Sequence, residues 1–171
     1  IAQGYTVDLV ADFFEKEKIS NYLVEIGGEV RVKGVNGKGI RWKIGIDKPS
    51  ELNVMPGQDV QAILNLDNIS VSTSGNYRNY YVENGVKYSH TINPKTGMPA
   101  KSNMLSASVI TDKCALADAY ATAFCNKTLN SGIISSLAEE ALEIPEIMSV
   151  VIIKDDIVGL GGSLEIVLND R

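Results

Sequence analysis

Residues 22–33 read YLVEIGGEVRVK, two strand-like runs separated by a pair of glycines. In the second run, polar and apolar side chains alternate, which is the period of a strand with one buried face. The pair Gly27-Gly28 indicates a bend, a bulge or a place where another part of the molecule approaches the backbone closely. This stretch therefore predicts two short strands joined by a constrained turn.

The residues that follow repeat this pattern. Asn36-Gly37 is a type I′ turn signal, and residues 41–47 alternate polar and apolar side chains, so we expect a hairpin with one solvent-facing side. Asn84-Gly85 is a second such signal and joins strand-like segments at 80–82 and 86–88. The chain thus favours antiparallel pairing.

Helices are expected at three places. Apolar residues recur at helical spacing within 5–17, residues 114–129 form an alanine-rich run with Asp112 as the expected cap, and another helix is expected at about 132–143. Antiparallel hairpins with a few packed helices indicate one α+β domain over residues 1–171. Further strands are expected at residues 60–66, 69–73 and 104–111 and within 150–168, with a structured loop at 93–99.

The composition excludes several classes of protein. The chain has 171 residues, 44% of them hydrophobic and 22% charged, which is ordinary for a globular domain. Its net charge of −5 argues against nucleic-acid binding, because phosphate neutralisation supplies most of that affinity. A phosphorylated ligand would need a metal ion or local amide donors. No apolar run approaches the roughly 20 residues that span a bilayer.

Asp118 and Thr122 are candidate metal ligands. They lie four residues apart in the expected helix, so their side chains share one face. A carboxylate among small and apolar neighbours is costly to bury unless it is paired, hydrogen-bonded or bound to a metal, and two hard oxygens suit Mg²⁺. From the residues alone, Asp118 could instead accept hydrogen bonds from a loop, and Thr122 could bond to the backbone of its own helix.

His90 is the only histidine, and it lies where a strand enters the Pro/Gly loop. Such positions are common for a general base, although a histidine that holds the loop by hydrogen bonds fits equally. The segment 72–80 is dense in hydroxyls and amides around Gly75, and it could cradle a phosphate or fix a loop. Its tyrosines favour cross-strand packing over stacking on a flat ring.

Cys114 and Cys125 are too few for a disulfide framework and lack metal-ligand spacing. On one helix they would lie about 16 Å apart, which is too far for a mutual bond. We expect two buried, small apolar thiols.

Taken in order, five segments resemble the ApbE family, the FAD:protein FMN transferases. The resemblance covers about residues 1–125 and thins after about 130. The matching segments are GYTVD at 4–8, YLVEIGGE at 22–29, STSGNYRNYY at 72–81, SHTINPKTGMP at 89–99 and ADAYAT at 117–122.

The resemblance implies an α+β, ApbE-like (T-fold-like) enzyme that uses Mg²⁺ and FAD. It implies transfer of FMN onto a Thr or Ser hydroxyl of a partner flavoprotein through a phosphodiester, with release of AMP. Asp118 and Thr122 match the metal ligands of the family, and His90 matches its proposed general base. Gln3 and Ile92 match positions that line the flavin nucleotide.

The chain departs from the family pattern at several positions. Ala121 stands where some members carry a further carboxylate ligand, Asn93 replaces the usual Asp, and Gln3 replaces a residue that is often Lys or Glu. Members are about twice as long, so we expect the chain to be the C-terminal half to two-thirds of a longer flavin transferase. The missing part would supply much of the flavin pocket. We therefore expect this stretch alone to bind FAD weakly and to be inactive.

Two other activities remain open at this point. The same residues would serve a Mg²⁺-dependent FAD pyrophosphatase that yields FMN and AMP, and a non-catalytic flavin-binding module is a further alternative. The resemblance also implies a location in the bacterial cell envelope, periplasmic or on the outer face of the cytoplasmic membrane. Members are often attached there through an N-terminal lipid anchor, which this sequence does not show.

Overall fold

The computed structural model describes residues 1–50, 52–53, 55, 57–77, 80–100, 102–127, 134–154, 157–162 and 166–168. Within these residues the helices are Ala2–Lys16 (α1), Cys114–Cys125 (α2) and Ile134–Leu142 (α3). The first strands are Tyr22–Ile26 (β1), Glu29–Lys33 (β2), Trp42–Asp47 (β3), Val60–Leu66 (β4), Ile69–Gly75 (β5) and Tyr80–Glu83 (β6). They are followed by Val86–Ser89 (β7), Ser106–Thr111 (β8), Ser149–Lys154 (β9), Ile157–Gly162 (β10) and Ile166–Leu168 (β11).

Antiparallel pairing organises every sheet in the described part of the chain. The main sheet has six strands in the order β1-β2-β5-β8-β9-β10. A smaller sheet has the order β11-β4-β3, and β6 pairs with β7 as a separate hairpin. The predicted α+β class with antiparallel sheets and few helices is therefore confirmed.

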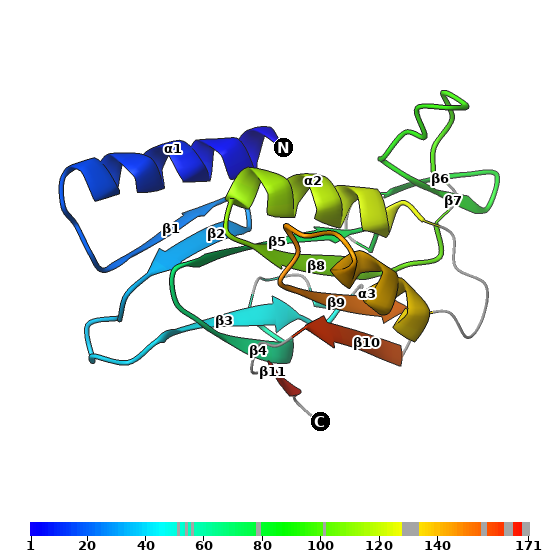
Figure 1. The fold of residues 1–171 in the computed structure, drawn as a ribbon. Coiled ribbons are helices and arrows are strands. Elements are labelled where there is room, and N and C mark those ends of the chain that lie inside the picture. Colours follow the sequence, from blue (N-terminus) through cyan, green and yellow to red (C-terminus); the bar gives the residue numbers. More distant parts are fainter. Residues whose placement is uncertain are drawn as a thin grey trace.

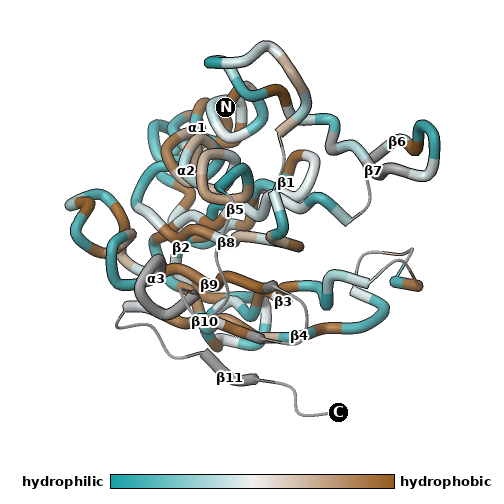
Figure 2. Tube along the Cα trace, turned by 90° about the vertical axis from the view of Figure 1, so that its right-hand side faces the viewer, coloured by the Kyte–Doolittle hydropathy of each residue, from teal (hydrophilic) through white to brown (hydrophobic). Residues whose placement is uncertain are grey.

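The main sheet lies between two layers (Figure 1). The three helices cover one face, and the β3-β4-β11 sheet lies against the other. Figure 2 shows the hydrophobic strands β8 and β9 between these layers. Because both faces are covered, alternate residues of β9 enter different cores: Val150 and Ile152 pack under α2 and α3, whereas Val151 and Ile153 pack against β4.

A third cluster of apolar residues holds α1 in place. Val7 and Ala11 of α1 are fully buried against Tyr22 and Val24 of β1 and against Cys114 of α2. The first turn of α1 consequently lies beside α2, which matters for the site described below. In the described residues, no helix is both long and apolar enough to cross a bilayer.

The helix boundaries differ from those expected. Helix α1 begins at Ala2 rather than at residue 5, and α2 ends at Cys125 within an expected range of 114–129, of which 128–129 lie outside the described residues. Helix α3 spans Ile134–Leu142, and the expected first residues 132–133 also lie outside the description. The strand expected at 104–111 is confirmed in its later part, 106–111.

Asp112 does not cap α2, so that prediction was wrong. The N-cap position is Lys113, which has an extended backbone and makes no capping hydrogen bond with its side chain. The cap comes instead from Asp8, 106 residues away, whose Oδ1 accepts from the N–H of Cys114 at 3.0 Å. Its Oδ2 accepts from the N–H of Ala115, also at 3.0 Å. A tertiary contact has taken the place of a local one.

Two of the expected turns join paired strands, and one does not. Asn84 and Gly85 have φ values of 51° and 77°, as a type I′ turn requires, and they join β6 to β7. Gly27 and Gly28 also have positive φ and close the β1–β2 hairpin. The hairpin expected at Asn36-Gly37 does not form, because β3 pairs with β4 and only the isolated bridge Val35–Arg41 crosses that turn.

Candidate functional site

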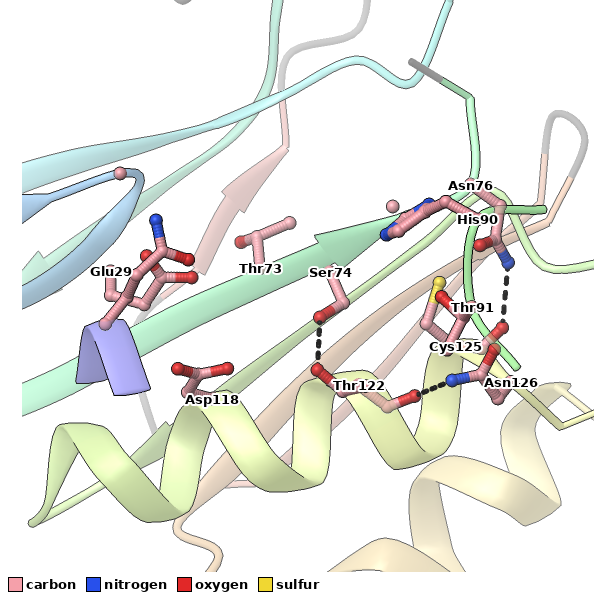
Figure 3. Close-up of a pocket in the computed structure, with 13 residues that line it drawn as sticks. Glu29, Thr73, Ser74, Asn76, His90, Thr91, Asp118, Thr122, Cys125 and Asn126 are labelled. Atoms are coloured by element: carbon pink, nitrogen blue, oxygen red, sulfur yellow. Dashed lines mark hydrogen bonds between the residues drawn. The ribbon is translucent and has the colours of Figure 1, made fainter. Parts of the chain in front are cut away.

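A cavity of about 240 Å³ lies where α2, the end of β5 and the first turn of α1 come together. Figure 3 shows Asp118 and Thr122 facing it from the same side of α2, one turn apart, as their spacing predicts. The main sheet forms its floor through β5, and the segment after β7 closes one end. Its polar lining includes Gln3, Glu29, Ser74, His90, Asp118 and Thr122.

Asp118 is only 6% exposed and lies against the start of α1. Its Oδ2 accepts a hydrogen bond from the Gly4 N–H at 3.0 Å and lies 2.7 Å from the α-ammonium of Ile1. Gly4 is required for this approach, because a Cβ there would strike the Cys114 carbonyl and would lie 2.9 Å from the Cβ of Asp118. The absence of one side chain therefore allows α1 to bring its backbone N–H to this carboxylate.

Asp8 fixes the helix that carries Asp118. Besides the two cap hydrogen bonds, its Oδ1 lies 2.7 Å from Nη1 of Arg31 on β2, and both side chains are 9% exposed. Burial by itself would lower the pKa of Arg31, but the hydrogen bond from Arg31 to Asp8 and the neighbouring negative charges leave it raised. One buried carboxylate thus joins α1, β2 and the N-terminus of α2, and protein donors satisfy both of its oxygens.

Glu29, the first residue of β2, is 7% exposed and enters the cavity from another wall. Its Oε2 is buried and has no hydrogen-bond partner in the described part of the molecule. Burial raises the pKa of the Glu29 carboxyl, and the negative charge of Asp118 raises it further. A buried acceptor without a donor is costly, so this atom is unlike the oxygens of Asp8.

The turn before Glu29 brings Gln3 into the same corner. A Cβ on Gly27 would strike the Nε2 of Gln3 and would lie 3.4 Å from Oε2 of Glu29. The glycine pair therefore provides both the tight turn and the close approach that the sequence left as alternatives. Gln3, predicted to contact the nucleotide, faces the cavity from α1.

Side chains from β5 form the rest of the floor. The hydroxyls of Ser74 and Thr122 are 3.1 Å apart and share a hydrogen bond. Asn76 donates from Nδ2 to the carbonyl of Cys125 at 3.0 Å, which holds the end of α2 to β5. Segment 72–80 thus both lines the cavity and fixes neighbouring backbone, although residues 78–79 lie outside the description.

His90 lies at the end of the cavity away from Glu29 (Figure 3). Its side chain is exposed and follows β7 directly, so it can reach both solvent and the interior of the cavity. Ile92 is placed differently: it is 52% exposed, bridges to Pro99 and does not line the cavity. Four of the five predicted site residues therefore meet in one place, and Ile92 lies outside it.

The lining fits a hard divalent cation with few protein ligands. Among the described residues, no three His, Cys, Asp or Glu side chains gather to hold a metal. The donors present are the carboxylate of Asp118, the hydroxyl of Thr122 and the unpartnered oxygen of Glu29, all of which are hard oxygens. Mg²⁺ is held in this way, by one or two protein ligands with water and substrate phosphates completing the shell.

The thiols take no part in this chemistry. Cys114 and Cys125 are free and buried, as expected, and burial raises the pKa of each to about 12. Cys125 borders the cavity, but a thiol that stays protonated is a poor nucleophile and a poor metal ligand.

The chain is similar in sequence to known proteins over most of its length. A sequence profile of the ApbE family matches residues 1–144. The FAD:protein FMN transferase of Vibrio cholerae is 41% identical over 150 residues, which are 88% of this chain and 43% of that protein. The Escherichia coli K12 protein of the same name is 40% identical over 122 residues, covering 71% of this chain and 34% of that one.

Solved structures extend the likeness to the fold. The flavin transferase ApbE from Vibrio cholerae superposes with a TM-score of 0.72 at 38% identity, covering 95% of this chain and 48% of that one. Flavinyl transferase ApbE of Pseudomonas stutzeri, in its apo form, gives 0.71 at 33% identity, covering 96% and 47%. The chain spans less than half of each of these relatives. It belongs to the ApbE family.

Proposed function

We propose that this chain is the part of an FAD:protein FMN transferase that holds the diphosphate of FAD and activates the acceptor hydroxyl. The observation that carries the proposal is one cavity lined by Asp118, Thr122 and His90, side chains that come from two segments distant in sequence. The names of the relatives support FAD as substrate and a protein as acceptor.

The reaction needs a base and charge neutralisation at a pyrophosphate. The hydroxyl oxygen of an acceptor Thr or Ser attacks the phosphorus on the FMN side, and His90 takes its proton. The bond from that phosphorus to the bridging oxygen breaks, and AMP leaves with the oxygen. The exposed position of His90 at the cavity mouth suits this role, because a protein acceptor must reach it from solvent.

Asp118 and Thr122 would hold Mg²⁺, and Gln3 would contact the nucleotide. When bound, the ion supplies Lewis-acid stabilisation of charge that develops on the phosphates. The Gly4 N–H orients the carboxylate of Asp118, and the hydroxyl of Ser74 orients the hydroxyl of Thr122. Hydrogen bonds of this kind fix the orientation of residues that hold a metal ion.

The test uses a chimaera in which this chain forms part of a full-length flavin transferase. The matching segment of the Vibrio cholerae relative is replaced by this chain and incubated with FAD, Mg²⁺ and an acceptor protein of that relative. We expect the acceptor to gain the mass of FMN with release of one AMP per acceptor. AMP release with free FMN and an unmodified acceptor would instead establish a pyrophosphatase.

Two variants assign the roles in that assay. His90→Ala should abolish transfer and spare FAD binding, whereas Asp118→Ala should remove the dependence on Mg²⁺. Wild-type transfer rates in both variants would refute the assignment. We also propose the cell envelope as the location, on the basis of family resemblance, and fractionation of the native host checks it.

A further inference from the structure

Glu29 is a carboxylate of the cavity lining that has no part in the proposed chemistry. It is nine-tenths buried and lines the cavity, and its buried Oε2 has no hydrogen-bond partner among the described residues. A position that merely packed β2 against α1 would not require a carboxylate. A buried acceptor without a partner, on a residue that lines a cavity, indicates a donor that arrives with the ligand.

The charges around Glu29 say what kind of donor fits. Asp118 faces the same cavity closely enough to raise the pKa of Glu29, so two acidic groups share one small volume. Arg31, a buried cation of the same strand, is paired with Asp8. The donors beside Glu29 are neutral ones, the hydroxyl of Ser72 and the side-chain amide of Gln3. What two acidic groups in one corner favour is a ligand that brings positive charge.

Hydrated Mg²⁺ supplies both positive charge and hydrogen-bond donors. The ion usually keeps several of its waters, and those waters are strong donors because the metal polarises them. With Asp118 and Thr122 as ligands on one wall, the waters on the opposite side would meet Glu29. Carboxylates that support a metal in this indirect way are a general feature of metal sites.

We propose that Glu29 is a positioning residue of the cation site, accepting hydrogen bonds from water molecules held by the divalent ion at Asp118 and Thr122. This inference rests on the proposed function for the presence of the ion. It adds a second carboxylate, from β2, to a pair that comes entirely from α2. It also assigns a role to the turn at Gly27-Gly28, because that turn places Glu29 beside the first turn of α1.

The test measures binding of Mn²⁺ alone to the 171-residue chain, from the loss of the free-ion electron paramagnetic resonance signal. Every protein is also made with one glycine before Ile1, which moves the ammonium away from Asp118. We expect Glu29→Gln to weaken Mn²⁺ binding by about 10- to 100-fold. The matched control Glu25→Gln removes an exposed carboxylate from the same hairpin and should bind as the wild type does.

A purely structural role for Glu29 would show itself in a second readout. Glu29→Gln should keep or slightly raise the urea unfolding midpoint of the metal-free chain while it loses affinity for the ion. A lowered midpoint with unchanged Mn²⁺ affinity would overturn the proposal. Asp118→Asn distinguishes failure of the cation site from failure of the role of Glu29. If Asp118→Asn abolishes Mn²⁺ binding while Glu29→Gln binds Mn²⁺ normally, only the role of Glu29 fails. If neither the original nor the glycine-extended wild type binds Mn²⁺, the cation site and the role of Glu29 both fail.

Discussion

Two buried acidic regions lie along α2, and they differ in what satisfies them. At the N-terminus of the helix, Asp8 receives hydrogen bonds from Arg31 and from two backbone N–H groups. One turn further along, Asp118 receives one backbone N–H from α1, while the Oε2 of the neighbouring Glu29 has no partner in the described residues. Both regions bury carboxylates at under 10% exposure.

The difference separates a structural from a functional use of the same chemistry. Desolvating a carboxylate costs several kcal/mol unless donors replace its water. The protein supplies all those donors to Asp8, which therefore stabilises the junction of α1, β2 and α2. In the region of Asp118 and Glu29 one buried oxygen is left without a donor among the described residues, and we propose that a bound cation completes this region.

The largest expected effect is on the satisfied region. Asp8→Ala leaves Arg31 buried without its closest partner and the start of α2 uncapped, so we expect a loss of about 3–5 kcal/mol in the free energy of unfolding. Urea denaturation measures it. Asp112→Ala is the control: it removes the exposed carboxylate that sequence predicted as the cap, and should change stability by no more than about 0.5 kcal/mol. Equal losses in the two variants would contradict the assignment of the cap.

Gly4→Ala should have the next largest effect. The added Cβ meets the backbone of Cys114, which cannot yield as a flexible side chain could, so α1 must move away from α2. We expect a loss of about 1–3 kcal/mol, measured in the same way. Gly37→Ala, where a Cβ meets nothing within 4 Å, should leave stability nearly unchanged. If the Gly4 variant is as stable as the wild type, the close approach is not needed.

Glu29→Gln should change the metal-free stability by less than about 1 kcal/mol, but it should alter the pH dependence. Because the pKa of Glu29 is raised in the folded state, protonated Glu29 contributes stability that is fully present below the ordinary pKa of 4.5. That contribution to stability is lost as pH rises through the folded-state pKa. The metal-free wild type should therefore lose stability relative to Glu29→Gln over that window. Parallel curves of unfolding free energy against pH would argue that Glu29 is not desolvated beside Asp118.

The smallest expected effect concerns the reactivity of the two buried thiols, and its measurement leaves both acidic regions of α2 unchanged. With pKa values of about 12 and no exposure, Cys114 and Cys125 should resist iodoacetamide at pH 8 in the folded chain and react fully in urea. Mass spectrometry counts the labels. Rapid labelling of Cys125 in the folded state would show that the cavity wall opens.

Local patterns predicted what local geometry decides. Asp118 and Thr122 share a face because a helix places residues four apart together, and the Asn84-Gly85 turn needed only its own φ values. Long-range choices could not be read in this way. Asp8 reaches α2 across 106 residues, and β3 left its expected partner for β4.

The site shows the same division. The shared helical face of its α2 residues could be predicted from their spacing. The role of Glu29 depends instead on β2 lying beside α1 and α2, which no spacing along the chain encodes. The only available signal was the glycine pair before it, which indicated a close approach without saying by what. Ile92, expected at the nucleotide, lies outside the cavity because its loop turns it towards solvent.

The central claim is that the cavity on α2 is completed by a divalent cation, and the increase in stability on adding Mg²⁺ tests it most directly. Urea unfolding of the glycine-extended chain is followed with and without Mg²⁺ in the wild type and in Asp118→Asn. An ion present at about 100 times its dissociation constant should stabilise the wild type by about 2.7 kcal/mol and leave Asp118→Asn unchanged. No increase in the wild type, or an equal increase in both proteins, would contradict the account.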